Sequence, residues 1–219
     1  MRLALLCWLG LLLAACDATP QAVGPGSSSA NFAYYLLALS WSPDYCAGNA
    51  TRDRQQCSRP YGFVLHGLWP QHERGWPADC DGAWMDKALM RQYAGLYPND
   101  RLFVHEWRKH GTCSGLTPQG YLALSAALKQ RVQIPSEFQR PSQALRISPA
   151  ALTAAFQRAN ADLPAEALAS FCSEGGRFLK EVRVCFDRSA AHYRACSAEV
   201  QRAASKSCRQ PAFVVRPLR

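Results

Sequence analysis

The chain has 219 residues, of which 48% are hydrophobic and 19% are charged. This supplies enough apolar mass for one compact domain with a sizeable core and leaves little for a second domain. Lys and Arg outnumber Asp and Glu by 25 to 16, and the resulting formal charge of +9 favours polyanionic partners such as nucleic acid or anionic lipid. Because many exported proteins are basic for no specific reason, the charge alone does not decide whether such a partner exists.

The chain begins with a secretion signal. Residues 1–15, MRLALLCWLGLLLAA, run from one arginine into an apolar stretch that ends in small residues. The apolar stretch is too short to span a bilayer comfortably, which favours a signal peptide over a transmembrane helix.

A lipid anchor is predicted directly after this signal. The stretch Leu13-Ala14-Ala15-Cys16 resembles the lipobox of bacterial lipoproteins, in which the cysteine is acylated and becomes the first residue of the mature chain. The alternative is an ordinary cleaved signal that removes Cys16 or leaves it as a free thiol. Residues 16–30 then form a flexible tether, rich in Gly, Pro and Ser, with an end-to-end distance of roughly 20 Å. We therefore expect an exported, periplasmic lipoprotein whose folded domain spans residues 31–219.

Cysteine usage indicates an oxidising compartment. Of ten cysteines, Cys7 leaves with the signal and Cys16 would carry the lipid, so an even set of eight remains. No pair in that set has the short gap of a zinc knuckle, which makes disulfides the better interpretation, although spacing alone leaves their pairing open. The set consists of Cys46, Cys57, Cys80, Cys113, Cys172, Cys185, Cys196 and Cys208.

Two buried strands are predicted near the start of the domain. Residues 32–41, FAYYLLALSW, are almost continuously apolar and aromatic, and residues 61–69, YGFVLHGLW, are similar. The second run is interrupted by His66. A lone histidine in such a strand is more often a core residue whose ring is satisfied by a backbone carbonyl.

Helices follow these strands. The patterns predict helices over residues 84–97 and from Asn99 to about Thr112, separated by a break at Pro98. A third helix begins after Thr117, which can cap it while a proline takes the first helical position.

The C-terminal part mixes helix and strand signals. Ser148-Pro149 repeats the start signal for a fourth helix. Residues 182–186 alternate between apolar and other side chains, which predicts a strand, and residues 212–215 form another short one. A central antiparallel sheet with helices packed around it defines an α+β fold.

The segment HEWRKHGTC, residues 105–113, concentrates titratable groups. On a helix each residue turns by about 100°, so His105, Glu106, Lys109 and His110 would share one strip. Such a strip is either a solvated charged face or a catalytic one. A zinc protease helix is excluded because it needs HExxH, whereas the two histidines here are five residues apart, roughly 140° around the helix.

Two segments together resemble a known family. FVLHGLWP, residues 63–70, and HEWRKHGTC resemble the two signature segments of the ribonuclease T2 family, in the same order. The resemblance covers roughly residues 32–210, including WPADC at 76–80 and the late cysteines. The chain departs from the family pattern at Leu102-Phe103 and Gln71-His72, near the presumed base pockets, so base preference stays open.

The resemblance implies an endoribonuclease that cleaves single-stranded RNA with low base specificity through 2′,3′-cyclic phosphate products. It implies that His110 is the general base, that His66 is the general acid, that Glu106 orients or polarises the site and that His105 contacts the phosphate. The chemistry agrees, because imidazole titrates at about 6.5 and can serve as base or acid. Lys109 would stabilise the developing oxyanion. We expect no metal and no cofactor.

Further expectations concern electrostatics and base binding. Glu106 near two histidines should raise the proton affinity of both. Trp69 offers either a flat face on which a base stacks, worth about 1–3 kcal/mol, or a packing surface.

The resemblance also implies disulfide pairs and an assembly state. The implied pairs are Cys80 with Cys113, Cys172 with Cys208, Cys185 with Cys196 and Cys46 with Cys57. The expected partners are RNA as substrate and a membrane reached through the lipid anchor, and we expect a monomer. The alternative function is a catalytically silent RNA-binding module with the same fold.

Overall fold

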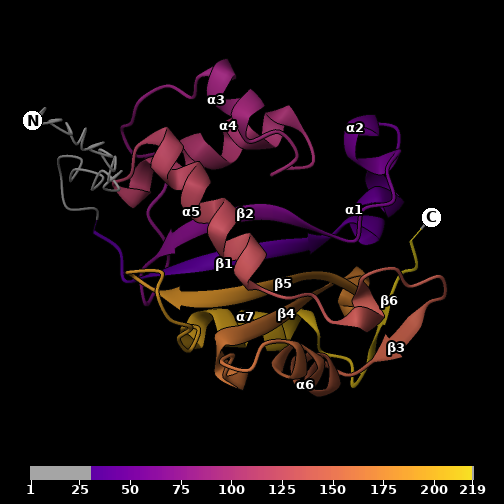
Figure 1. Cartoon of the computed structure of the whole chain (residues 1–219). Coiled ribbons are helices and arrows are strands. Elements are labelled where there is room, and N and C mark those ends of the chain that lie inside the picture. The colour runs from indigo at the N-terminus through magenta and orange to yellow at the C-terminus, as the bar shows by residue number, and fades with distance from the viewer. Residues whose placement is uncertain (1–30, 219) are drawn as a thin grey trace, which may run out of the picture.

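The computed structural model describes residues 31–218, and Figure 1 shows the whole chain. The predicted signal peptide, the lipid anchor at Cys16 and the tether over residues 16–30 lie outside the described residues. The α+β prediction is confirmed, because a sheet forms the centre and helices cover it (Figure 1).

The sheet formed by the described residues has six strands in the order β2-β1-β5-β6-β3, with β4 paired to β5. All strand pairs in it are antiparallel except β5 with β6. The predicted strands at both ends of the domain are present. The sequence patterns missed two strands: the three-residue β3, and β4, whose side chains are buried almost without interruption and so show no alternation. The strands are β1 (Tyr34–Trp41), β2 (Phe63–Gln71), β3 (Leu145–Ile147), β4 (Leu168–Ser173), β5 (Phe178–Asp187) and β6 (Phe213–Val215).

Between residues 31 and 218, seven α-helices join these strands. Two of them begin as predicted, because the Thr117 side chain accepts a hydrogen bond from Gly120 N and the Ser148 side chain accepts one from Ala151 N. The helices are α1 (Ser42–Asn49), α2 (Arg54–Cys57), α3 (Lys87–Gln92), α4 (Asp100–Lys109), α5 (Pro118–Arg131), α6 (Pro149–Ala159) and α7 (Ala198–Ser207).

Two predicted helices are shorter than expected. The helix predicted over residues 84–97 is only α3, which begins where Asp86 caps Ala88 N and is followed by a left-handed turn at Gly95. The helix predicted to reach about Thr112 ends at Lys109, and a short 3-10 helix, η1 (Gly111–Ser114), follows it. His110 lies between the two, with φ −127° and ψ −45°. This histidine is therefore at a break in the backbone and not on the strip of α4.

The two faces of the sheet are packed differently. On one face, Val182 and Val184 of β5 join the large core built with α4, α5 and α6. On the other face, Cys185 joins a smaller cluster with Trp69 of β2 and Val200 of α7. In Figure 1, α5 and α7 accordingly lie on opposite sides of the sheet.

An irregularity in β2 sets the direction of His66. Leu65 pairs with Leu39 of β1, but the next pair joins Gly67 to Ala38, so His66 is the extra residue of a β-bulge. The bulge shifts the alternation by one residue. Leu65 and Leu68 consequently both face the large core, while Trp69 faces the smaller cluster.

Four disulfides staple the described part of the chain: Cys46 with Cys57, Cys80 with Cys113, Cys172 with Cys208, and Cys185 with Cys196. These are the pairs that the family resemblance implies. Cys80–Cys113 bears directly on the position of His110, because it ties η1, which begins at the next residue, to the segment that precedes α3.

Candidate active site

His66 is held by a buried carboxylate that belongs to neither of the two sequence motifs. Its Nδ1 lies 2.7 Å from Glu181 Oε2 on β5, and its Nε2 lies 3.8 Å from Glu106 Oε1 on α4. Glu181 is 1% exposed, whereas the His66 side chain is 36% exposed. An ionised carboxylate can only accept a hydrogen bond, so Nδ1–H donates to Glu181, and Nε2 makes no hydrogen bond with that carboxylate.

Glu181 is itself fixed by two further donors. Ser40 Oγ donates to Oε2 at 2.9 Å, and Arg183 Nε donates to Oε1 at 2.7 Å. Burial would raise the pKa of Glu181, but its contacts with His66 and Arg183 lower it to about 2. The carboxylate therefore stays charged at any physiological pH.

The pKa of His66 is raised above its ordinary value. Burial of the ring lowers it, but the hydrogen bond and charge of Glu181, together with the weaker attraction of Glu106, outweigh burial. The expectation that Glu106 raises the proton affinity of His66 holds, although Glu181 is the stronger partner. Glu181 directly precedes the alternating residues from which the strand at 182–186 is predicted. The sequence pattern does not show, however, that it pairs with His66, which lies 115 positions away.

Glu106 is buried beneath this group. It is 1% exposed, and Trp69 Nε1 donates to its Oε2 at 2.7 Å. Burial raises its pKa to about 7, against the opposing effects of His66 and of the Trp69 hydrogen bond. Gly67 makes this contact possible, because a Cβ at that position would collide with Glu106 Oε2 and Trp69 Nε1.

Trp69 is largely buried and makes packing contacts, which is one of the two roles that the sequence left open for it. The residue is 9% exposed. The rings of His66 and His110 lie 5.1 and 5.2 Å from its ring, and the Arg183 guanidinium lies 5.0 Å from its centroid. The remaining exposed surface of Trp69 lines the same cavity as Lys109 and His110.

The pKa of His110 is shifted in the opposite direction from that of His66. Burial lowers its pKa to about 4, and the nearby His105, His66 and Lys109 charges act in the same direction. Its buried Nδ1 has no hydrogen-bond partner among the described residues. The expectation that Glu106 raises the proton affinity of His110 is therefore wrong, because α4 ends before His110 and the Glu106 carboxylate turns toward Trp69 and His66.

Lys109 and His105 complete the group on α4. Lys109 Nζ pairs with Asp79 Oδ2 at 2.5 Å, and the Lys109 contact lowers the pKa of Asp79. Asp79 has a left-handed backbone, with φ 54°, and its N–H donates to the Lys109 carbonyl. The His105 side chain is 63% exposed, with Nε2 4.0 Å from Glu106 Oε1. Both Lys109 and His105 are thus accessible to a ligand.

Two cavities meet at this group. One, of about 910 Å³, is lined by His66 and His105, and the other, of about 430 Å³, is lined by His105, Lys109 and His110. His105 belongs to both. All six predicted site residues therefore surround one region. His66 lines the larger cavity and His110 lines the smaller one, and both rings lie next to the Trp69 indole.

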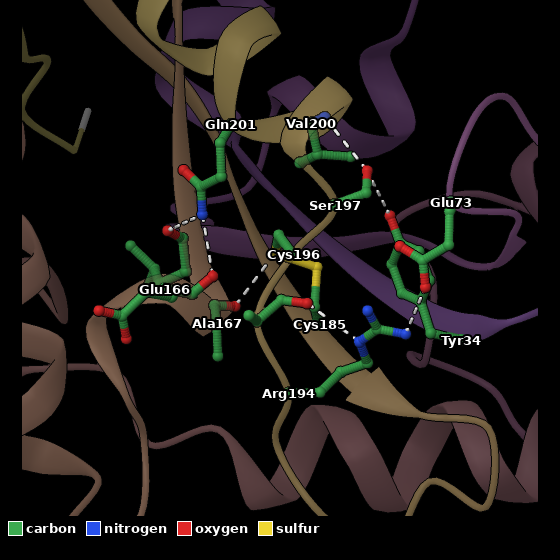
Figure 2. Close-up of a disulfide and its surroundings, with 12 residues drawn as sticks. Tyr34, Glu73, Glu166, Ala167, Cys185, Arg194, Cys196, Ser197, Val200 and Gln201 are labelled. Atoms are coloured by element: carbon green, nitrogen blue, oxygen red, sulfur yellow. Dashed lines mark hydrogen bonds and ion pairs between the residues drawn. A yellow bond between two sulfur atoms is a disulfide. The ribbon is translucent and has the colours of Figure 1, made fainter.

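Several contacts connect the segments beside the second cavity. Figure 2 shows the Cys185–Cys196 disulfide, which ties β5 to the segment before α7, and Arg194, which reaches Glu73 at 2.9 Å. Gly75 N donates to Glu199 Oε2 at 3.0 Å. These contacts fix the loop after β2.

That loop carries Trp76, the first residue of the WPADC segment, for which the sequence patterns suggested no role. Trp76 is 54% exposed and lines the same cavity as His110. Among residues 31–218, no cluster of His, Cys, Asp and Glu has the geometry of a metal site.

Comparisons with known proteins agree with this geometry. A model of the ribonuclease T2 family matches residues 32–196. A ribonuclease of Aeromonas hydrophila is 39% identical over 224 residues, covering 96% of this chain and 97% of the relative.

Solved structures share the fold. An RNase-related protein from Calystegia sepium has a TM-score of 0.64 at 21% identity, covering 85% of this chain and 97% of that chain. A variant of RNase MC1, a protein of bitter gourd seeds, was solved in complex with 5′-UMP. It has a TM-score of 0.61 at 21% identity, and the match covers 74% of this chain and 91% of that chain. At these identities the likeness shows the fold alone.

The contact between Glu181 and His66 predicts opposite titration of the two histidines. By NMR of ¹³C-labelled histidine, His66 should titrate above its ordinary value and His110 near 4. Glu181→Gln should lower the pKa of His66, because the charge that favours the imidazolium is removed. Glu166→Gln, which alters an exposed carboxylate elsewhere, should leave both unchanged. If the pKa of His66 were unchanged in Glu181→Gln, the contact with Glu181 would not be what raises that pKa.

The close approach at Gly67 predicts a cost for any side chain there. Gly67→Ala should destabilise the domain by about 2 kcal/mol in urea unfolding, because Glu106 and Trp69 must move apart. Gly48→Ala is the matched control, since a Cβ there meets nothing within 4 Å. Equal stability of the two variants would contradict this packing.

Proposed function

The chain belongs to the ribonuclease T2 family and is a T2-type endoribonuclease, and we propose that His110 acts as its general base and His66 as its general acid. In this reaction His110 takes the proton of the 2′-hydroxyl, whose oxygen attacks the adjacent phosphorus. His66 Nε2–H gives its proton to the departing 5′-oxygen. The products are a 2′,3′-cyclic phosphate and a free 5′-hydroxyl, and DNA is not cut because it lacks the nucleophile.

One observation carries these roles. The two imidazoles flank the same indole, yet their surroundings move their pKa values apart, to about 4 for His110 and above the ordinary value for His66. Between those values His110 is neutral and can accept a proton, while His66 is charged and can donate one.

The cavities support an orientation for the substrate. The nucleoside that carries the attacking hydroxyl lies in the cavity beside His110, and the leaving nucleoside lies in the larger cavity beside His66. Trp69 and Trp76 both line this cavity, and the more exposed Trp76 is the main proposed stacking surface for the first of these bases. Stacking on an indole tolerates every base, which agrees with low base specificity on single-stranded RNA.

Lys109 and His105 are proposed to contact the scissile phosphate. Both line the cavity beside His110 and both are partly exposed. A fixed positive charge next to the crowded phosphorane stabilises the charge that develops on its oxygens. Glu106, which is buried behind them, positions Trp69 and lies beside His66. All these steps use protein side chains, with no metal or cofactor.

No observation favours the catalytically silent alternative. A module that only binds RNA has no need for two histidines whose pKa values are moved in opposite directions around one indole.

The protein is exported, in agreement with the four disulfides of its described part. We further propose that it resides in the periplasm as a monomer, tethered to a membrane by lipid on Cys16, with residues 1–15 removed and residues 31–219 as the catalytic domain. Within residues 31–218, no helix is long and apolar enough to cross a membrane.

The proposed roles predict a metal-independent reaction with a defined pH profile. Cleavage of yeast RNA should persist in excess EDTA. The rate should fall below about pH 4 as His110 becomes protonated, and should fall again above the ordinary histidine range as His66 loses its proton. A strict need for a divalent ion would rule out the metal-free mechanism.

Single substitutions test each histidine. His66→Ala and His110→Ala should each lower kcat/KM by about 10²- to 10⁴-fold while RNA binding changes only a few-fold. His192→Ala, at an exposed position, is the matched control and should keep full activity. A near-normal rate in either active-site variant would remove the role assigned to that residue.

The lipid anchor has its own test. When cells are labelled with a palmitate analogue, the wild-type protein should be marked and Cys16→Ser should not. Equal labelling of both would refute acylation at this cysteine.

A further inference from the structure

Arg183 is a cation of the active-site region that the roles above leave unused. It lies on β5 and lines the cavity beside His110, together with Lys109. Its side chain is 25% exposed, so it reaches the cavity from a largely buried position.

The guanidinium of Arg183 is fixed in place. Its Nε donates to Glu181 Oε1 at 2.7 Å, and its Cζ lies 3.8 Å from the Phe171 ring centroid and 5.0 Å from that of Trp69. Within the described part of the chain, its two Nη groups have no hydrogen-bond partner. The Nε side of the guanidinium is held by Glu181 and its plane packs against two aromatic rings. The two Nη groups are therefore oriented in advance to bind an anion through two parallel hydrogen bonds.

The carboxylates near Arg183 are already engaged by other groups. Glu181 is shared by Arg183 and His66, and one carboxylate cannot neutralise two cations. Asp79 is paired with Lys109, and Glu199, which also lines the cavity, accepts a hydrogen bond from Gly75 N. Within the described residues, Arg183 therefore shares its ion-pair partner with His66.

We propose that Arg183 binds a second phosphate of the RNA, the one on the 5′ side of the nucleoside whose 2′-hydroxyl attacks. This inference rests on the base and acid roles proposed above, because those roles place that nucleoside in the cavity that Arg183 and His110 share. The site then binds two consecutive phosphates. Lys109 and His105 contact the scissile one, and Arg183 contacts the preceding one.

Three short substrates isolate this contact. ApA has only the scissile phosphate, pApA adds one on the 5′ side, and ApAp adds one on the 3′ side. For the wild type, kcat/KM should be at least about tenfold higher for pApA than for ApA, as expected for one charge-assisted contact. Arg183→Gln should bring that ratio close to one, Arg183→Lys should keep part of it, and neither should change the ratio of ApAp to ApA.

Controls separate this role from an effect on Glu181. Loss of Arg183 also changes the surroundings of His66, but that effect acts equally on all three substrates and cancels in the ratios. Arg108→Gln removes the same charge from a neighbouring surface, where the guanidinium lies 5.8 Å from the Trp84 ring, and should keep the wild-type ratio. The salt dependence gives a second readout, since the log–log slope for pApA should fall by about 0.7 in Arg183→Gln.

The outcomes are distinguishable. If wild-type protein fails to cleave ApA and longer RNA, the proposed function fails. The phosphate contact is overturned if the wild type has equal kcat/KM for ApA and pApA, or if Arg183→Gln lowers kcat/KM for all three substrates by the same factor. Either result leaves the proposed nuclease function intact. If Arg183→Gln does not fold, the wild-type ratio and Arg183→Lys still decide the question.

Discussion

The hydrogen bond between Glu181 and His66 is the constraint on which this active site depends. A fully buried carboxylate is expensive to keep charged, and it stays charged here because Ser40, Arg183 and His66 all donate to it. The ionised carboxylate in turn fixes the His66 tautomer and raises its pKa, which leaves Nε2–H free to act as an acid. Removing any partner of this group therefore changes the surroundings that set the pKa of His66.

Both histidines stand where the backbone departs from regular structure. His66 is the extra residue of a bulge in β2, and His110 lies at the break between α4 and η1. A regular strand would turn Trp69 toward the large core, and a continuous helix would place His110 on the strip of Glu106. The two irregularities bring both imidazoles against one indole, as is typical of bulges and helix ends near functional sites.

Charge is distributed unevenly around the scissile position. Negative charge is buried behind the histidines in Glu181, while Lys109, His105 and Arg183 line the cavity in front. This arrangement raises the pKa of His66 and leaves Lys109 and Arg183 on the surface of the cavity. The Cys185–Cys196 disulfide and the Arg194–Glu73 ion pair connect the segments on either side of this cavity (Figure 2).

Features that are encoded locally could be predicted from the order of the amino acids: the apolar runs of β1 and β2, the capped starts of α5 and α6, the even cysteine set, and the two segments that resemble a nuclease family. The same reasoning could not show that Trp69 is buried, that α4 stops before His110, or that Glu181 is the partner of His66. Capping and periodicity act over a few residues, so they can be read from a short stretch. The pairing of Glu181 with His66 joins positions 115 residues apart, and it exists only because the register of three strands brings them together.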